Sequence, residues 1–374
     1  MKMDAQFALT DNQRAIIGAV LASPDIRRSQ VAKQLGISAQ TTMRAVLPLI
    51  KMGALQETLL STGGRGKPAN GLKFAPGSLL TLGISLASDR VRIQYCDLAG
   101  STLVSLNTER VYESAADQVA QLDQLLSESQ KQIAASAILV GVGVSVQGYL
   151  LDKGVRFMAR ADPIGWASFD LKAHLFARFR VPIKLMNDGK TLTSSLTLTS
   201  PYRNFFCLHL SSGIGGGIVS GGHLLMGANG NAGEIGKLFS HAPDRPIDTA
   251  FLKAAGLASW ADWPGFAKLP PKDHQSLCRF LHHAGGLIST ALEQSLAILD
   301  FEAVYLCSRM PKDLLTALCD HIDVQPLGTS LVGKTSDLRN PAPVLHPYHV
   351  PHFAPLACRM ALDVFLTPAK TTFV

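Results

Sequence analysis

The feature that most constrains this chain is a glycine-dense run in its middle. The twelve residues Ser211–Gly222 read SSGIGGGIVSGG and hold six glycines, directly after the apolar run FFCLHL. An apolar run followed by dense glycine is typical of a strand that enters a tight turn and lets the backbone approach another group closely. Phosphate is the first candidate for that group, because the exposed N–H groups of a glycine turn form an anion-binding nest.

Length and composition describe a globular chain. It has 374 residues, of which 47% are hydrophobic and 17% charged, enough for two or three domains with their own cores. It contains no uncharged apolar run of membrane-spanning length, and its polar start, MKMDAQFALTDNQ, lacks the apolar centre of a signal peptide. We therefore expect a cytoplasmic protein that does not contact the membrane. None of its six cysteines has CxxC spacing, so we expect buried thiols.

Positive charge is concentrated at the N-terminal end. The formal net charge is +7, and the first 75 residues hold ten lysines and arginines against four acidic residues. A basic end on a nearly neutral body indicates a polyanionic partner there.

The same end has the pattern of a winged helix-turn-helix. TDNQRAIIGAVLAS has an N-cap candidate, Thr10 or Asp11, and a helical stripe of apolar residues. RSQVAKQLG predicts a second, short helix that Gly36 ends, and ISAQTTMRAVLPLIKMG a third helix, kinked by Pro48. ALQETLLSTGGRGKPANGLKFAP then predicts two short strands around a polar tip, the wing.

Helix-turn-helix spacing predicts that the start of the third helix enters a major groove of double-stranded DNA, where Gln and Arg read base edges. An Arg between glycines suits a narrow minor groove. The alternative is a three-helix module that binds protein and has a solvated basic loop. For the DNA hypothesis, the candidate contact residues are Ser38, Gln40, Thr41, Thr42, Arg44, Arg65 and Lys67.

The pattern changes after Leu79. LLTLGISLA, RVRIQYCDLAG and STLVSLNTERV predict three strands with short turns, and helices then alternate with strands. This order describes a mixed-sheet α/β domain, and its duplication gives the ribonuclease-H-like or actin-like fold of sugar kinases.

At this point the chain resembles the ROK family of repressors, uncharacterised reading frames and sugar kinases. The matching segments run in family order and cover almost the whole chain: the winged helix-turn-helix, GRGKPANGLKFAP, VGVGVSVQGYL, GWASFDLK, NDGK, SSGIGGGIVSGGHLLMGANGNAGEIGK and LAILDFEAVYL. The long glycine segment with GEIG is the most specific of them. The N-terminal domain is similar to that of the repressor branch.

The resemblance also predicts that kinase chemistry has been lost. In the first phosphate turn, GISLASDR, the expected Asp is Ser85 and the expected Gly is Ala87. The glycines near the adenine are replaced by Cys307–Arg309, whose side chains should fill the space. Asp188 of NDGK matches the family's catalytic base but is expected to be inactive, and the glycine loop to be structural. We expect no nucleotide cofactor.

The family's zinc ligands are a His after GEIG and three cysteines in a CxCGxxGC-like run. Here the His is Lys237, and the following segment, LFSHAPDRPIDTAFLKAAG, contains no cysteine and only His241 as a histidine. The acid that usually follows the cysteines has no clear counterpart in the sequence. The resemblance therefore predicts no metal.

The family's sugar-binding positions are half kept. Lys190 replaces the second Asn of an NDAN-like motif, and Gln147 a Pro. Two hypotheses remain open: a pocket that senses a sugar or sugar derivative, and a vestige whose acids pair with Lys190 and Lys237. In one form of the sensing hypothesis, Lys237, assisted by Lys190, binds an anionic group of the effector, such as that of a sugar acid or sugar phosphate. The matching positions are Gly148, Asp162, Asn187, Asp188, Glu234 and Lys237.

The leading hypothesis is a DNA-binding transcriptional regulator, a repressor of carbohydrate-related genes, that binds its operator as a homodimer or a dimer of dimers. The alternatives are an active sugar kinase with a regulatory DNA-binding module and a regulator without a ligand. The expected domains are a DNA-binding domain (1–76), a first ROK subdomain (77–190 and 300–374) and a second ROK subdomain (191–299).

Overall fold

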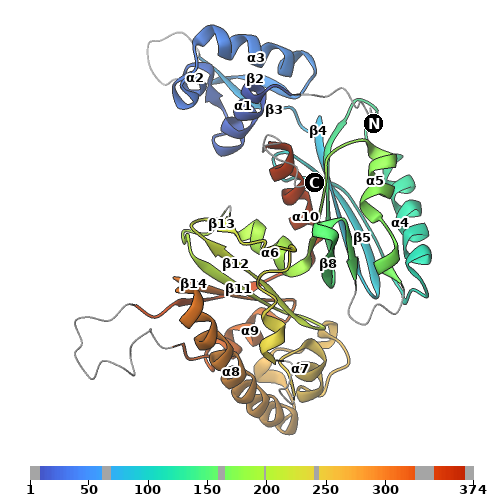
Figure 1. Ribbon diagram of the computed structural model, residues 1–374, viewed down its shortest axis with the longest axis vertical. Coiled ribbons are helices and arrows are strands. Elements are labelled where there is room, and N and C mark those ends of the chain that lie inside the picture. The colour runs from blue at the N-terminus through green and yellow to red at the C-terminus, as the bar shows by residue number, and fades with distance from the viewer. Residues whose placement is uncertain are drawn as a thin grey trace. The chain divides into compact units, whose positions relative to one another are not determined.

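The computed structural model describes residues 9–60, 69–158, 165–197, 199–239, 244–324 and 341–366. They form two compact units (Figure 1). The first unit runs to Met186 and also takes in the C-terminal segment from Phe353, and the second unit is Asn187–His352.

The first unit begins with a small domain of three helices and a three-stranded sheet, in the order β1-β3-β2. Its elements are α1 (Asp11–Ala22), β1 (Ile26–Arg27), α2 (Arg28–Leu35), α3 (Ala39–Lys51), β2 (Leu55–Leu60) and β3 (Ala69–Phe74). The predicted helices and wing strands are confirmed. Thr10 caps α1 in a capping box with Gln13, and Gly36 ends α2 in the left-handed conformation.

A five-stranded sheet, β10-β7-β4-β5-β6, forms the rest of the first unit. The middle strand, β4, pairs antiparallel with β5 and parallel with β7. Helices α4 and α5 cover one face and α10 packs on the other (Figure 1). The bounds are β4 (Leu79–Ala87), β5 (Arg90–Asp97), β6 (Thr102–Glu109), α4 (Ala115–Gln130), β7 (Ile138–Val146), α5 (Leu171–Phe179), β10 (Ile183–Asn187) and α10 (Ala354–Leu366), with a small hairpin of β8 (Tyr149–Leu151) and β9 (Arg156–Met158).

Helix α10 contacts both the sheet and the core of the N-terminal domain. Its backbone lies so close to the sheet that a Cβ at Gly83 would overlap the carbonyl oxygen of Ala354, and one at Gly143 that of Ala357. At its other end, Phe365 is buried in the core of the N-terminal domain, together with Val140 from the sheet. The helix therefore supports both the sheet and the N-terminal domain.

The second unit repeats the strand pattern of the first in the order β13-β12-β11-β14-β15. Its middle strand, β11, pairs antiparallel with β12 and parallel with β14, as β4 does with β5 and β7. This repetition confirms the predicted duplicated α/β fold. The bounds are α6 (Asp188–Leu196), β11 (Phe205–Leu210), β12 (Ile214–Ser220), β13 (His223–Leu224), α7 (Asp248–Ala254), α8 (Pro271–Leu299), β14 (Ala303–Ser308), α9 (Lys312–Cys319) and β15 (Val344–His349).

Two predicted boundaries differ from the structure. Residues 187–190 and 300–374 were expected in the first ROK subdomain, but residues 187–190 and 300–352 lie in the second unit. For residues 300–352 the reason is strand pairing, since β14 joins β11 along its whole length and β15 joins β14. Only the segment that contains α10 returns to the first unit. In the described part of the chain, no helix has both the length and the apolarity of a membrane span.

Candidate functional sites

The start of α3 is built by hydrogen bonds among three predicted DNA contacts. The Ser38 hydroxyl oxygen accepts the backbone N–H of Thr41 at 3.0 Å and lies 2.9 Å from the Thr41 hydroxyl oxygen. Thr42 corrects the prediction, because it is only 1% exposed and its hydroxyl donates to the Ser38 carbonyl oxygen. Thr42 therefore holds the first turn of the helix and does not face DNA.

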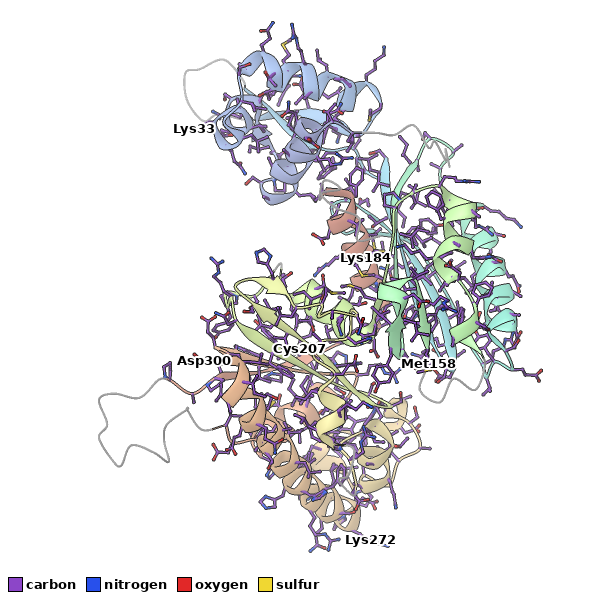
Figure 2. The ribbon with its side chains drawn as sticks, in the orientation of Figure 1. Lys33, Met158, Lys184, Cys207, Lys272 and Asp300 are labelled. Carbon is purple, nitrogen blue, oxygen red and sulfur yellow. The ribbon has the colours of Figure 1, made fainter. Side chains whose placement is uncertain are left out.

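Two other predicted contacts, Gln40 and Arg44, are exposed on α3. Neither helix α2 nor helix α3 contains an acidic residue, and Lys33 adds a positive charge at the surface of the domain (Figure 2). The exposed side of this helix pair is therefore positive. The predicted wing residues Arg65 and Lys67 lie outside the described residues.

The glycine run forms the hairpin β11–β12, as predicted, and its glycines make room for helix α6. A Cβ at Gly217 would overlap the Thr193 side chain of α6, and one at Gly216 would overlap the carbonyl oxygen of Cys207 in the neighbouring strand β11. Gly189 of α6 is as tightly placed, since a Cβ added there would lie 2.5 Å from the Gly216 nitrogen. Close packing between helix and hairpin is therefore one reason for this glycine density.

That packing places the start of α6 beside a carboxylate. Asn187 caps the helix by accepting the backbone N–H of Lys190 at 2.9 Å, and its amide donates to Glu234 Oε1 at 2.8 Å. The Lys190 ammonium is completely buried, and its nitrogen lies 3.7 Å from the same Oε1. Burial lowers the pKa of Lys190 and raises that of Glu234, and each charge opposes the shift of the other.

Asp188 lies next to a buried histidine. Its Oδ1 accepts the N–H of Gly189 at 2.8 Å, and its Oδ2 is 3.7 Å from His209 Nδ1. Burial raises the pKa of Asp188 to about 6 and lowers that of His209 to about 4. Near pH 7 the histidine is therefore neutral and the carboxyl is mostly ionised. Gly215 stands opposite His209 in the hairpin and leaves space for the carboxylate.

His209, Asp248 and Arg309 also belong to this cluster and were not among the predicted site residues. Asp248 is the first residue of α7, and its Oδ2 is 3.4 Å from Arg309 Nη2. Its negative charge favours the protonated form of His209 and so opposes the downward shift of that pKa. No acidic site residue was predicted in the segment after GEIG. The pattern PIDTAF, which places an acidic residue at the start of a helix, could have indicated Asp248.

The structure brings together some of the predicted sugar-binding residues. Asn187, Asp188 and Glu234 lie in the second unit, whereas Gly148 follows β7 in the first unit. Lys237 lies in the short 3₁₀ helix Ile235–Phe239, and its side chain is exposed. Asp162 and His241 are outside the described residues. Among the residues that are described, no three His, Cys, Asp or Glu side chains are placed to hold a metal ion.

The positions that match the family's nucleotide site take part in the following contacts. Ser85 pairs with Arg92 across β4 and β5, and the Ala87 carbonyl accepts the side-chain amide of Gln118 at 2.7 Å. In the second unit, the Cys307 sulfur is buried 3.5 Å from the sulfur of Cys207, the residue that Figure 2 labels.

Comparison with known proteins gives two domain matches and relatives that align over part of the chain. Residues 81–246 match the ROK family, and residues 9–56 match winged helix-turn-helix DNA-binding domains. The uncharacterized protein y4fQ of Sinorhizobium fredii is 26% identical over 347 residues, which cover 85% of this chain and 83% of that protein. The xylose repressor of Bacillus spizizenii is 24% identical over 246 residues, 63% of this chain and 62% of the repressor, less than two thirds of its length.

Among solved structures, a ROK family transcriptional regulator described as a homolog of the E. coli MLC protein superposes with a TM-score of 0.69 at 14% identity. The superposition covers 95% of this chain and 96% of that one, so the fold is shared from the N-terminal domain to α10. Residues 81–246 thus form a ROK-family domain, and a winged helix-turn-helix DNA-binding domain precedes it in the same chain.

Proposed function

We propose that this protein is a DNA-binding transcriptional repressor of carbohydrate-related genes, and that its ROK domain senses a sugar and does not phosphorylate one. The observation that carries the proposal is the surface of α3. Gln40 and Arg44 are exposed there and free of hydrogen bonds and ion pairs to the described residues, and no acidic residue shares the helix. Uncommitted amide and guanidinium groups on a positive helix suit the edges of bases. The relatives named xylose repressors support the sugar-linked part.

The sugar effector is assigned to the cluster at the start of α6. Asn187 and Glu234 supply an amide and a carboxylate, and Asp188 adds a second carboxylate, the groups that hydrogen-bond hydroxyls as donors and acceptors. The Lys190–Glu234 ion pair is one of the pairings that the alternative hypothesis, a vestigial pocket, expected. In this proposal, the effector must compete with Lys190 for the Glu234 carboxylate.

The proposed assembly is a homodimer or a dimer of dimers that acts on chromosomal DNA in the cytoplasm. Helix-turn-helix proteins commonly read two half-sites, and the symmetry of a palindromic operator then matches that of the dimer.

The first prediction tests DNA binding. The full-length chain should enrich an inverted repeat from a pool of random duplexes, and the logarithm of its affinity should fall linearly with that of salt concentration, because Lys and Arg release condensed counterions. Arg44→Ala should relax base choice at one position of each half-site, whereas Lys33→Ala should weaken all sites alike and make the salt slope shallower. If no duplex is enriched at low salt, the protein is not a DNA-binding regulator.

The second prediction concerns phosphoryl transfer. Without an acid at Ser85 and a glycine at Ala87, Mg–ATP lacks a charge partner and a close backbone contact in the first phosphate turn. A coupled assay of ADP release with hexoses, pentoses and amino sugars should stay at background. Turnover above roughly 1 s⁻¹ that Asp188→Asn abolishes would instead support a sugar kinase with a regulatory DNA-binding domain. Turnover that survives Asp188→Asn indicates a contaminating kinase.

A further inference from the structure

The exposed side of α3 is apolar at two positions where a surface helix is expected to be polar. Met43 is 49% exposed and Leu47 is 48% exposed, and one helical turn separates them. Both lie on the same helix as Gln40 and Arg44 and outside the core of the N-terminal domain.

Helical periodicity defines how these four side chains share the surface. At 3.6 residues per turn, Gln40 and Leu47 fall on one line along the helix, two turns apart and about 10 Å from each other. Met43 lies to one side of this line and Arg44 to the other. The opposite face is formed by residues that are buried in the domain: Thr42, Ala45, Val46 and Leu49.

The charges around this face identify its partner as a polyanion. Three acidic residues belong to the described part of the domain, and each has a partner within the domain. Asp11 pairs with Arg14 at 3.2 Å, Glu57 pairs with Arg28 at 2.6 Å, and Asp25 accepts the Thr58 hydroxyl at 2.6 Å. An apolar strip inside a positive, acid-free surface is matched by the DNA major groove, which displays phosphates at its rims and thymine methyl groups on its floor.

We propose that Met43 and Leu47 read thymine, by packing against the C5-methyl groups of thymine bases in the major groove. Gln40 and Arg44 lie beside them and present groups that suit adenine and guanine, respectively. The half-site should thus combine thymines with an adenine and a guanine within one turn of duplex. This inference rests on the proposed function, because it describes what the same helix recognises.

The test removes single methyl groups from the DNA. The probe is the duplex that the full-length protein enriches from a random pool, resynthesised with deoxyuridine in place of one thymidine at a time. Deoxyuridine keeps the base pair and loses only the C5-methyl. At one or two thymines per half-site, the dissociation constant should rise about four-fold, the effect of removing one methyl group from apolar contact. The other thymines should tolerate the replacement.

Protein variants then assign each methyl group to a side chain. Met43→Ala should abolish the deoxyuridine penalty at one thymine, and Leu47→Ala at another. Both side chains are half exposed, so their truncation leaves the domain folded. Ile298→Ala is the matched control, because it truncates an apolar side chain that is 84% exposed on α8, in the second unit, and should change no penalty.

Three outcomes overturn the inference. If no duplex is enriched, the proposed function fails and the inference falls with it. If a duplex is enriched but deoxyuridine has no effect at any thymine, or keeps its full effect in both alanine variants, DNA binding stands and methyl readout is wrong. If the variants keep their DNA affinity but change the oligomeric state, the strip is a contact between copies of the chain.

Discussion

Alanine at Gly83 or Gly143 is expected to lower the free energy of unfolding by about 3 kcal/mol, the upper part of the range for overpacking a core. The new Cβ would overlap the carbonyl oxygen of Ala354 in the first variant and of Ala357 in the second. Both oxygens belong to the backbone of α10, so no side-chain rotation can relieve the overlap. The helix must move away from the sheet. Urea denaturation of the purified variants measures the loss.

Gly18→Ala is the matched control in the same unit. Gly18 lies inside α1, and a Cβ there would meet no atom within 4 Å. The same substitution should therefore stabilise the protein by up to about 1 kcal/mol, since alanine favours the helix more than glycine does. If Gly83→Ala and Gly143→Ala were as harmless as Gly18→Ala, α10 would not be held where the structure has it.

The same variants should also weaken DNA binding beyond their loss of stability. Phe365 of α10 is buried in the core of the N-terminal domain, so a helix displaced from the sheet also withdraws support from that domain. Helix α10 follows directly on one of the two places where the chain passes between the units. The measurement is DNA affinity at a temperature where all variants remain folded.

Local signals in the sequence predicted most of the fold. Thr10 caps α1 and Gly36 ends α2 in the structure, as the sequence around each residue indicated. The glycine run was predicted as a strand and turn, and it is the β11–β12 hairpin. Such features depend on neighbours a few residues apart, and therefore remain visible in one sequence.

Long-range pairing was harder to predict. β14 joins β11 although about 100 residues separate them, and this pairing is what moved residues 300–352 into the second unit. The polar cluster shows the same limit. His209 reads as part of an apolar strand and Asp248 as an ordinary helix start, and only the folded sheet brings them together. Thr42 was a plausible DNA contact until its place on the buried face of α3 was known.

Removing the Glu234 carboxylate is expected to cost more stability than any other single change in the polar cluster. Glu234→Ala leaves the Lys190 ammonium without its ion-pair partner at a position with no exposure to solvent. Breaking a buried pair in this way costs about 3–5 kcal/mol, because the remaining charge has lost its solvation and its partner. The Asn187 amide also loses its acceptor at 2.8 Å. Urea denaturation at pH 7 should show the loss as a lower midpoint with an unchanged slope.

The compensating change is at Lys190. Methionine has a similar length and no charge, so Lys190→Met removes the buried ammonium that needs the carboxylate. Replacing both members of a buried pair with uncharged groups of similar volume is often neutral or stabilising. We therefore expect the double variant Lys190→Met/Glu234→Gln to be close to the wild type in stability. An exposed ion pair, Arg110 with Asp117, provides the control, and Asp117→Ala should have only a small effect.

A double-mutant cycle compares the wild type, Lys190→Met, Glu234→Gln and the double variant. It separates two roles of Lys190. If the losses from Lys190→Met and Glu234→Gln simply add in the double variant, the two groups do not interact and the ion pair is not a feature of the folded protein.

If the losses cancel in the double variant, the ion pair is real, and Lys190→Met becomes the test of sugar binding. Among the described residues, that variant leaves Asn187 as the hydrogen-bond partner of the Glu234 carboxylate. A neutral sugar that competes with Lys190 for this carboxylate should then bind more tightly, and calorimetric titration should detect it more readily in Lys190→Met than in the wild type. A sugar acid held by the ammonium should instead lose affinity, so the direction of the change identifies the charge of the effector.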